Sequence, residues 1–326
     1  MPTTPNRAQT WIDSGKVTPF WKRGVFCVRL NVEPSDRKTQ PIAVGVDPGS
    51  KKEAFTVKSD SHTYLNVQTD AVTWVKDAVE TRRQMRRTRR GRKCPHRKCR
   101  PNRLINFQKL PPSTKSRWQW KLRILNWLKK MYPITCVIVE DIKARTHKNG
   151  KKWNGIFSPL EVGKQWFYEQ IKSQFKLETK QGYETKQLRD SLSLKKTSNK
   201  MCNKFEAHCV DSWVLANWFV GGHTKPDNVG LLQIIPLQFH RRMLHALQPA
   251  KSGIRRPYGG TRSLGFKRGS LVKHVKYGIC YVGGFMNDRI SLHSIGVGKR
   301  LCQNAKVVDC KFLSFNSWRW SASSVS

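Results

Sequence analysis

Short apolar runs separated by polar turn residues fill the first 70 positions of the chain. Alternation of apolar and polar positions over residues 24–32 predicts one strand. A short helix is expected before it, over residues 5–16. The next runs are bounded by turn residues such as Pro48-Gly49-Ser50, the pattern of an antiparallel meander. The predicted strands of this meander are residues 42–47, 53–57 and 63–67.

A helical period replaces this alternation in the middle of the chain, where apolar residues recur every three or four positions. The pattern predicts helices over residues 71–93, 117–131, 159–175 and 203–216. Asn203 and Glu206 have the spacing of a capping box at the start of the last helix. Two β-type runs interrupt the helices, at residues 134–139 and 175–179. The polar stretch 188–200 is expected to be a loop.

Residues 221–326 return to short β-type runs between turns, and they contain few acids. Candidate strands are residues 271–275, 279–282, 290–293 and 307–312. This pattern predicts a small, basic and mostly β module. Together the three regions indicate an α/β protein with a β-rich C-terminal part.

The charge of the chain indicates the class of its binding partner. The 326 residues include 62 Lys and Arg against 21 Asp and Glu, a net charge of +41. Nucleic acid is the polyanion that such a surface favours. A membrane is the rival, but no run of about 18 apolar residues exists to span one. The polar N-terminus is not a signal peptide, and nine scattered cysteines indicate reduced thiols in a cytoplasmic protein.

A run of arginines continues the helix predicted after the meander. If helical, it has cations on most of its faces, and bound phosphates would neutralise them. A solvated tail or a localisation signal is the alternative. The pair Cys94 and Cys99 suggests zinc only weakly, because no second pair follows at finger spacing. The nucleic-acid-binding candidates in this run are Arg82, Arg83, Arg86, Arg87, Arg89, Arg90, Arg92 and Lys93.

Four residues are candidates for catalysis. Asp47 and Glu140 each follow a buried β-type run, and His208 and Asp211 share one helix face. Each has a plain structural explanation alone: a turn residue, a surface charge or a core histidine. Together, three acids suit two hard divalent cations that clamp the oxygens of a phosphodiester during hydrolysis. His208 has the pKa range of a general base for the attacking water.

The order of these motifs resembles IsrB, the family of RuvC-only relatives of the transposon-encoded IscB nucleases. The resemblance covers nearly the whole chain. The matching segments are Gly45-Val46-Asp47-Pro48-Gly49, the arginine run, Leu110 to Ser113, Pro133 to Glu140, Ser158 to Lys164 and Ala207 to Ser212.

The resemblance implies an RNase H-like (RuvC) mixed sheet, split by an arginine-rich bridge helix, in which the first and fourth strands are neighbours. Asp47, Glu140 and Asp211 are expected to bind two Mg²⁺ (or Mn²⁺), with His208 as general base. A guide RNA (omega RNA) and a target double-stranded DNA with a flanking motif are the implied partners, with one protein chain per RNA. Arg255, Arg256 and Arg262 are candidates for contacts with that motif.

The implied domain organisation has six parts, of which the first retains only Met1-Pro2 of the Pro-Leu-Met-Pro motif that names the corresponding domain. These parts are a small N-terminal domain (1–40), RuvC segment I (41–78), the bridge helix with a basic linker (79–110), RuvC segment II (111–200), RuvC segment III (201–222) and a basic β-rich module (223–326).

The strand specificity of the reaction follows from a missing insert. IscB proteins carry an HNH nuclease domain between the second and third RuvC segments, whereas only residues 141–207 separate Glu140 from His208. One nuclease centre implies a nickase acting on the displaced, non-target strand. Two alternatives remain open at this point: a guide-free nuclease of the same fold, such as a junction resolvase, and a non-catalytic basic RNA-binding protein.

Overall fold

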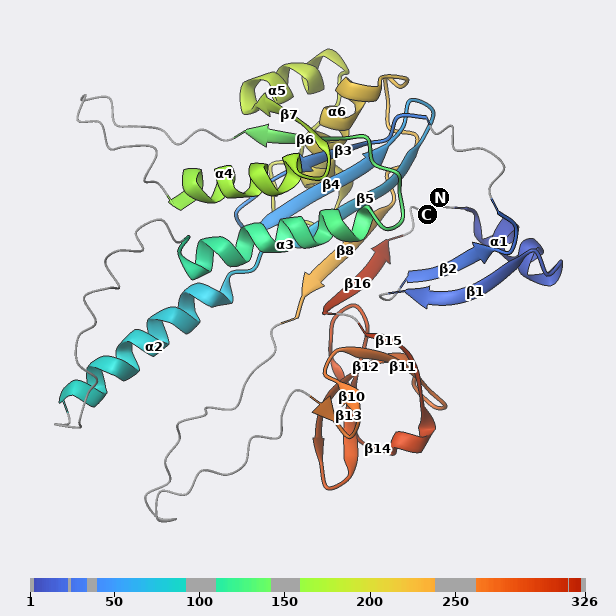
Figure 1. Ribbon diagram of the computed structural model, residues 1–326, viewed down its shortest axis with the longest axis vertical. Coiled ribbons are helices and arrows are strands. Elements are labelled where there is room, and N and C mark those ends of the chain that lie inside the picture. Colours follow the sequence, from blue (N-terminus) through green and yellow to red (C-terminus); the bar gives the residue numbers. More distant parts are fainter. Residues whose placement is uncertain are drawn as a thin grey trace. The chain divides into compact units, whose positions relative to one another are not determined.

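The computed structural model describes residues 3–22, 25–33, 40–91, 110–141, 159–237, 262–315 and 317–323. The chain divides into two compact units. The larger unit is formed by residues 38–232, with the two chain ends. The second unit is formed by residues 2–37 and 233–322. Figure 1 labels the helices and strands of both.

The larger unit is built around a mixed β-sheet, which contains both parallel and antiparallel strands. Its meander is formed by β3 (Ala43–Asp47), β4 (Lys52–Lys58) and β5 (Thr63–Asp70), followed later by β6 (Cys136–Asp141) and β7 (Lys176–Gln181). β4 is antiparallel to β3 and to β5, whereas β6 is parallel to β3 and to β7. The order of these strands in the sheet is β5-β4-β3-β6-β7. Two further strands are β8 (Leu231–Pro236) and β16 (Trp318–Ser323).

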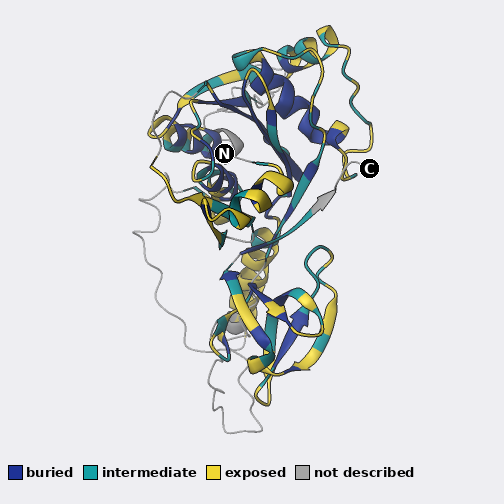
Figure 2. Ribbon diagram, turned by 90° about the vertical axis from the view of Figure 1, so that its right-hand side faces the viewer, coloured by how far each residue is buried: buried dark blue, intermediate teal, exposed yellow. Residues whose placement is uncertain are grey.

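The two faces of the sheet are covered by different helices. On one face, α6 (Phe205–Val220) packs on β3 and β4, and its residues from Ala207 to Asn217 are all buried. On the other face, α3 (Pro112–Leu128) reaches the sheet through Trp120, whose Nε1 donates to Thr69 Oγ1 at 3.0 Å. α3 also packs against α2 (Trp74–Gly91) and α4 (Pro159–Lys172). Dark blue in Figure 2 marks the buried strands and the buried helix.

The second unit contains a short helix and mainly antiparallel strands. Its first part is α1 (Pro5–Asp13) and a hairpin of β1 (Val17–Lys22) and β2 (Val25–Leu30). A five-stranded sheet in the order β14-β13-β12-β11-β15 forms the rest, with a small pair of β9 (Arg262–Ser263) and β10 (Phe266–Lys267). The five strands are β11 (Ser270–His274), β12 (Gly278–Met286), β13 (Arg289–His293), β14 (Arg300–Ala305) and β15 (Cys310–Phe315).

The predicted strands of both β regions are confirmed, with shifts of up to four residues at their ends. Strands β1, β8, β9, β10, β14 and β16 were not predicted, and α3 begins at Pro112 rather than at residue 117. The segment 307–312 begins as a single 3₁₀ turn at Val307–Asp309, and strand β15 starts only at Cys310.

The prediction of a loop over residues 188–200 was partly wrong, because α5 (Gly182–Ser191) extends into it. A capping box starts this helix, where the Glu184 side chain accepts the Gln181 backbone N–H at 2.6 Å. The capping box predicted for α6 was also wrong, since Lys204 is its N-cap and makes no side-chain cap bond. Asn203 Oδ1 instead accepts Lys52 Nζ at 3.0 Å, because a buried ammonium needs acceptors.

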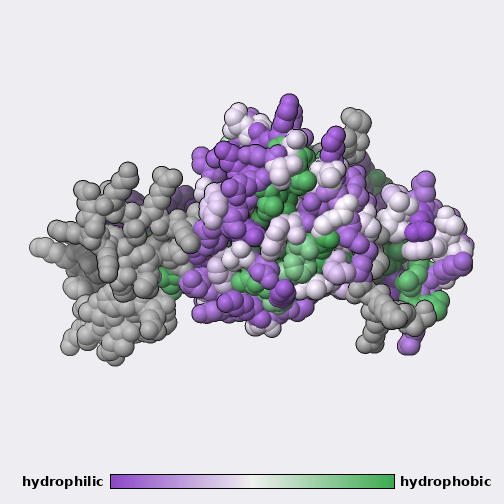
Figure 3. Space-filling model, turned by 90° about the horizontal axis from the view of Figure 1, so that it is seen from above, coloured by the Kyte–Doolittle hydropathy of each residue, from purple (hydrophilic) through white to green (hydrophobic). Residues whose placement is uncertain are grey.

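No described helix is long and apolar enough to cross a membrane. Figure 3 shows one face of the molecule, on which hydrophilic residues surround smaller hydrophobic areas.

Candidate active site

The alternation of side chains along two parallel strands brings Asp47 and Glu140 together. Val46 lies opposite Val139 in the register of β3 and β6, so Asp47 and Glu140 follow on neighbouring strand ends. Ala43 and Ile138, at even spacing from these acids, pack in the core beneath α6. Because residues two apart share a face, both acids are directed to the face that α6 covers.

A close approach at Gly45 lets α6 add its polar residues to this face. A Cβ on Gly45 would lie 1.8 Å from the Ser212 carbonyl oxygen and 2.9 Å from the Ala216 nitrogen. Only glycine permits α6 to contact β3 at this distance. The contact places the first two turns of α6, which carry His208 and Asp211, beside the end of β3.

His208 bonds directly to Asp47. Its Nδ1 lies 2.9 Å from Asp47 Oδ2, and its Nε2 lies 3.0 Å from the carbonyl oxygen of Lys200. Burial lowers the pKa of His208, but the hydrogen bond to Asp47 and the negative charge of Asp47 outweigh burial, so the pKa is raised. Two acceptors at the two ring nitrogens favour the imidazolium form. A general base needs the neutral ring, so this state has to lose a proton before it acts as one.

Asp211 is buried and both of its oxygens are taken by cations of the chain. Arg189 Nη1, from α5, donates to Oδ1 at 2.6 Å, and Lys196 Nζ contacts Oδ2. Lys196 lies in the segment between α5 and α6. Neither residue was predicted, because the signal is a long-range pairing that no local spacing reveals.

Glu140 lies close to the two other acids of the site. Burial raises its pKa to about 7, and the charges of Asp47 and Asp211 and a side-chain hydrogen bond with Asp47 act in the same direction. The charge of Lys196 acts against them without restoring the ordinary pKa. An added cation would relieve this mutual repulsion between carboxylates.

Asp141, the next residue, serves to hold the strand end. Its oxygens accept Lys164 Nζ at 2.7 Å, Tyr168 Oη at 3.1 Å and Gln181 Nε2 at 2.8 Å. Burial raises the pKa of Asp141, but these hydrogen bonds outweigh it and the pKa is lowered. Asp141 points away from the acids because adjacent strand residues face opposite sides. Its contacts fix the direction of Glu140.

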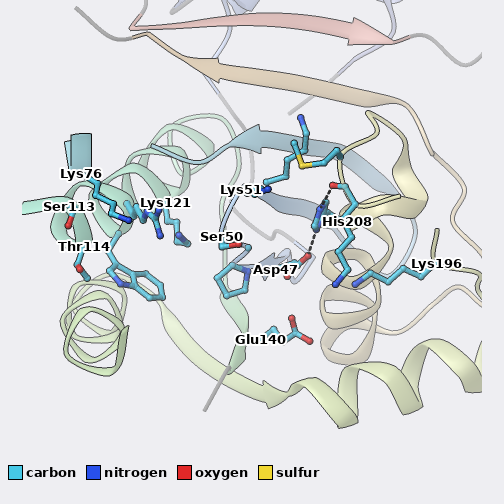
Figure 4. A pocket seen from close by; sticks show the side chains of 17 residues that line it. Asp47, Ser50, Lys51, Lys76, Ser113, Thr114, Lys121, Glu140, Lys196 and His208 are labelled. Atoms are coloured by element: carbon cyan, nitrogen blue, oxygen red, sulfur yellow. Dashed lines mark hydrogen bonds and ion pairs between the residues drawn. The ribbon is translucent and has the colours of Figure 1, made fainter. Parts of the chain in front are cut away.

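Asp47 and Glu140 open into a cleft of about 730 Å³. Figure 4 shows Asp47, Glu140, His208 and Lys196 at one end, and Lys76, Ser113, Thr114 and Lys121 at the other. Its lining includes seven Lys or Arg side chains against the two carboxylates Asp47 and Glu140. The cleft therefore has the charge of a surface that binds a polyanion around a small acidic centre.

The donor chemistry of the site suits a hard divalent cation, but the arrangement is not a preformed metal centre. Over the described part of the chain, no group of three or more His, Cys, Asp and Glu side chains is arranged to hold a metal ion. Lys196 and Arg189 neutralise Asp211, as a metal would. Three convergent carboxylates and the raised pKa of Glu140 fit a divalent cation once Lys196 leaves Asp211.

The predicted nucleic-acid-binding arginines are only partly within the described residues. Arg82, Arg83, Arg86 and Arg87 lie on α2 and line a hollow of about 600 Å³ with Val79 and Pro112. Arg262 is exposed in β9. The backbone of Arg89 and Arg90 belongs to α2, but their side chains are outside the described residues. Arg92, Lys93, Cys94, Cys99, Arg255 and Arg256 lie wholly outside them.

These features define an α/β protein with a cleft in which acids of two adjacent parallel strands meet the polar face of a helix. In the comparison with family models, residues 1–156 match the model described as RRXRR protein. The comparison with curated proteins found no match. Among solved structures, the chain is similar to T. thermophilus RuvC in complex with a Holliday junction substrate. The identity is 13% and the TM-score 0.28, covering 56% of this chain and 98% of that one.

Proposed function

We propose that this protein is a metal-dependent nuclease of the RNase H type that hydrolyses DNA phosphodiesters in the cleft beside Asp47. The convergence of Asp47, Glu140, His208 and Asp211 at one end of the sheet carries this proposal. The strand order β5-β4-β3-β6-β7, an antiparallel meander followed by two parallel strands, is consistent with an RNase H-like fold. Its central strand and the neighbouring parallel strand supply the first two acids.

Asp47, Glu140 and Asp211 would hold Mg²⁺, which supplies positive charge to the scissile phosphate and to the attacking water. Lys196 then has to release Asp211, and its ammonium is free to contact the substrate phosphate. Arg189 keeps Asp211 in place from the buried side, since its side chain is only 14% exposed. His208 loses its proton when Asp47 no longer accepts its Nδ1–H, and it then takes a proton from the water.

The partner is proposed to be a guide RNA that selects the DNA strand by base pairing. The arginines of α2 and the net charge of +41 exceed what one catalytic cleft needs. A helix with arginines along its length suits the backbone of an RNA–DNA heteroduplex, which proteins hold without reading its sequence. A single acidic centre in the described residues fits cleavage of one strand, the displaced one.

The test begins with the RNA. The protein is expressed with its native flanking sequence, purified, and the RNA that copurifies is sequenced. A supercoiled plasmid carrying the matching target is then incubated with the complex in Mg²⁺. We expect an open-circular, nicked product in Mg²⁺, no product in EDTA, and no product from a plasmid with a scrambled target.

Each of the other outcomes favours a different function for this protein. Nicking that is independent of target sequence and of RNA contradicts guidance and favours a guide-free structure-specific nuclease. A copurifying RNA without cleavage in Mg²⁺ or Mn²⁺ contradicts the nuclease and favours a non-catalytic RNA-binding protein. Linear plasmid as the first product contradicts the restriction to one strand.

A further inference from the structure

A second polar group lies in the same cleft, at the end away from Glu140. Lys76 comes from the first turn of α2, and Ser113, Thr114, Arg117 and Lys121 come from α3. Figure 4 shows Lys76, Ser113, Thr114 and Lys121 gathered at this end. None of these residues belongs to the acidic centre, and the proposed hydrolysis makes no use of them.

Lys121 is the fixed member of this group. The residue is 3% exposed although it lines the cleft. Its Nζ donates to Glu53 Oε1 at 2.7 Å and lies 4.6 Å from the centre of the Trp118 ring. Most exposed lysines lose rotamer entropy when they bind an anion. Lys121 is already ordered, so an anion at the cleft wall binds it without that cost.

A structural role alone does not account for this pair. A buried ion pair seldom adds net stability over a well-packed apolar pair of the same volume. Here Glu53 is fully buried, and its second oxygen, Oε2, has no hydrogen-bond partner. Burial raises the pKa of Glu53, and the nearby charge of Asp47 also raises it, while Lys121 opposes both. Glu53 Oε1 accepts one of the three N–H donors of Lys121, which lines the cleft, so the ammonium has further donors to offer to an anion there.

The neighbours of Lys121 supply the rest of an anion site. Arg117 is half-buried one turn earlier on the same helix, and Lys76 is exposed. Lys52 and Lys196 also line the cleft and pair with Asp70 and Asp211, as Lys121 pairs with Glu53. The hydroxyl groups of Ser113 and Thr114 are neutral donors at the same end of the cleft. Cations combined with hydroxyl donors are the groups that proteins use to contact phosphate oxygens.

We propose that Lys76, Ser113, Thr114, Arg117 and Lys121 form a phosphate-binding subsite for the backbone of the cleaved DNA strand. This inference rests on the proposed function, because it places one phosphate here while another phosphate of the same strand lies at Asp47. Lys121 and Arg117 are positioning residues: they hold the strand and do not touch the reacting bond. The subsite gives the strand a fixed path across the end of the sheet.

The first experiment measures binding without cleavage. Fluorescence anisotropy follows a fluorescein-labelled single-stranded DNA of six thymidines in EDTA over a range of salt concentrations. Arg117→Gln removes one cation at little cost to folding. The pair Glu53→Gln with Lys121→Gln removes the buried charges together. Lys130→Gln, an exposed lysine beyond the other end of α3, is the matched control for net charge.

Removing a charge-assisted bond to phosphate should weaken binding about tenfold in the Arg117 variant and in the double variant. The slope of log Kd against log salt should fall by about 0.7 for each phosphate of a single strand that the variant no longer neutralises. Lys130→Gln should change neither quantity. Equal weakening by Lys130→Gln, or unchanged slopes in both cleft variants with wild-type melting curves, overturns the subsite.

The second experiment places the subsite on the substrate. Single methylphosphonate linkages, which remove one phosphate charge, are introduced near the cleavage position of the displaced strand. One linkage should raise KM more than it lowers kcat in the wild type, and it should cease to matter in Arg117→Gln. Absence of cleavage altogether contradicts the proposed function but leaves the binding result to decide the subsite. Weakened binding of six uridines with unchanged binding of six thymidines overturns the assignment to the DNA strand.

Discussion

The buried carboxylates on the two faces of the central sheet differ in their partners. On the α6 face, Asp47 and Glu140 lie next to each other at the ends of parallel strands. On the α3 face, Glu53 is neutralised by Lys121 from a helix of the same chain. The difference lies in where the positive charge comes from. Glu53 has a lysine of the same chain as a lasting partner. Glu140 forms no ion pair with a described residue, and its pKa is raised to about 7, which leaves a site for a cation from solution.

Asp211 is intermediate between these two cases. It belongs to the α6 face, yet Arg189 and Lys196 contact both of its oxygens. Arg189 is largely buried and Lys196 is more exposed, with side-chain exposures of 14% and 27%. The comparison predicts that Arg189 is a permanent partner and Lys196 an exchangeable one.

The largest effect should distinguish two adjacent acids. Glu140→Gln removes a carboxylate from the cleft and is expected to reduce nicking to background. Asp141→Asn changes a carboxylate that is held by Lys164, Tyr168 and Gln181, and it should retain most of the nicking rate while lowering the melting temperature. Plasmid nicking and thermal melting measure the two properties. Equal loss of nicking in both variants contradicts the distinction.

The next effect concerns stability on the α3 face. Lys121→Met leaves Glu53 buried without its cation, so the free energy of unfolding should fall by about 3–5 kcal/mol. Adding Glu53→Gln should restore much of this loss, because the unpaired charge is then removed. Urea denaturation measures both. A double variant that is no more stable than Lys121→Met shows that packing rather than charge dominates.

Overpacking at Gly45 should have a smaller cost. Gly45→Ala places a methyl group against the Ser212 carbonyl, and we expect a loss of about 1–3 kcal/mol, with α6 pushed from β3. Nicking should fall with it, since His208 and Asp211 move with the helix. Gly91→Ala is the control, because its Cβ meets no atom within 4 Å. Equal stability of the two variants contradicts the close approach.

A still smaller effect is expected on the pH dependence of the metal-free protein. The pKa of Glu140 is raised from 4.5 to about 7 in the fold, so its protonated form is the one that the fold favours. This contribution to stability is present below pH 4.5 and is lost as the pH rises through 7. As the pH rises from 4.5 through 7 in EDTA, the melting temperature of the wild type should fall more than that of Glu140→Gln. Added Mg²⁺ should stabilise the wild type more at about pH 8 than at about pH 6, because the carboxylate that binds it is then ionised.

The smallest effect should come from a surface pair on α2. Glu80 lies 3.8 Å from Arg83, and both side chains are at least half exposed. Glu80→Gln should change the free energy of unfolding by no more than about 0.5 kcal/mol. It should also leave RNA binding intact, because it removes no cation. Weaker RNA binding in this variant would indicate that α2 contacts RNA through more than charge.

The sequence predicted the positions of Asp47 and Glu140 because local patterns determine them. An apolar run that ends in an acid is visible along the chain, and the 3.6-residue period places His208 and Asp211 on one face. Strand order and register then bring these residues together. Gly45 lies in the apolar run before Asp47, but its close contact with α6 depends on packing that no local pattern reveals.

Pairings between distant residues could not be predicted in this way. Lys196 and Arg189 on Asp211, and Lys121 on Glu53, join positions 15 to 68 residues apart. Many lysines and arginines have the same local surroundings in a chain with 62 of them. The predicted cap at Asn203 failed for a related reason, since buried Lys52 takes its oxygen. The buried Lys52 ammonium needs an acceptor, and this need outweighs the local preference of Asn203 for capping the helix.

Nicking by Asp47→Ala tests the central claim most directly. The variant and the wild type are purified with the same RNA and incubated with a supercoiled target in Mg²⁺. We predict that Asp47→Ala binds RNA and target with wild-type affinity and produces no nicked plasmid. Nicking by Asp47→Ala at the wild-type rate would contradict the assignment of the cleft as the active site.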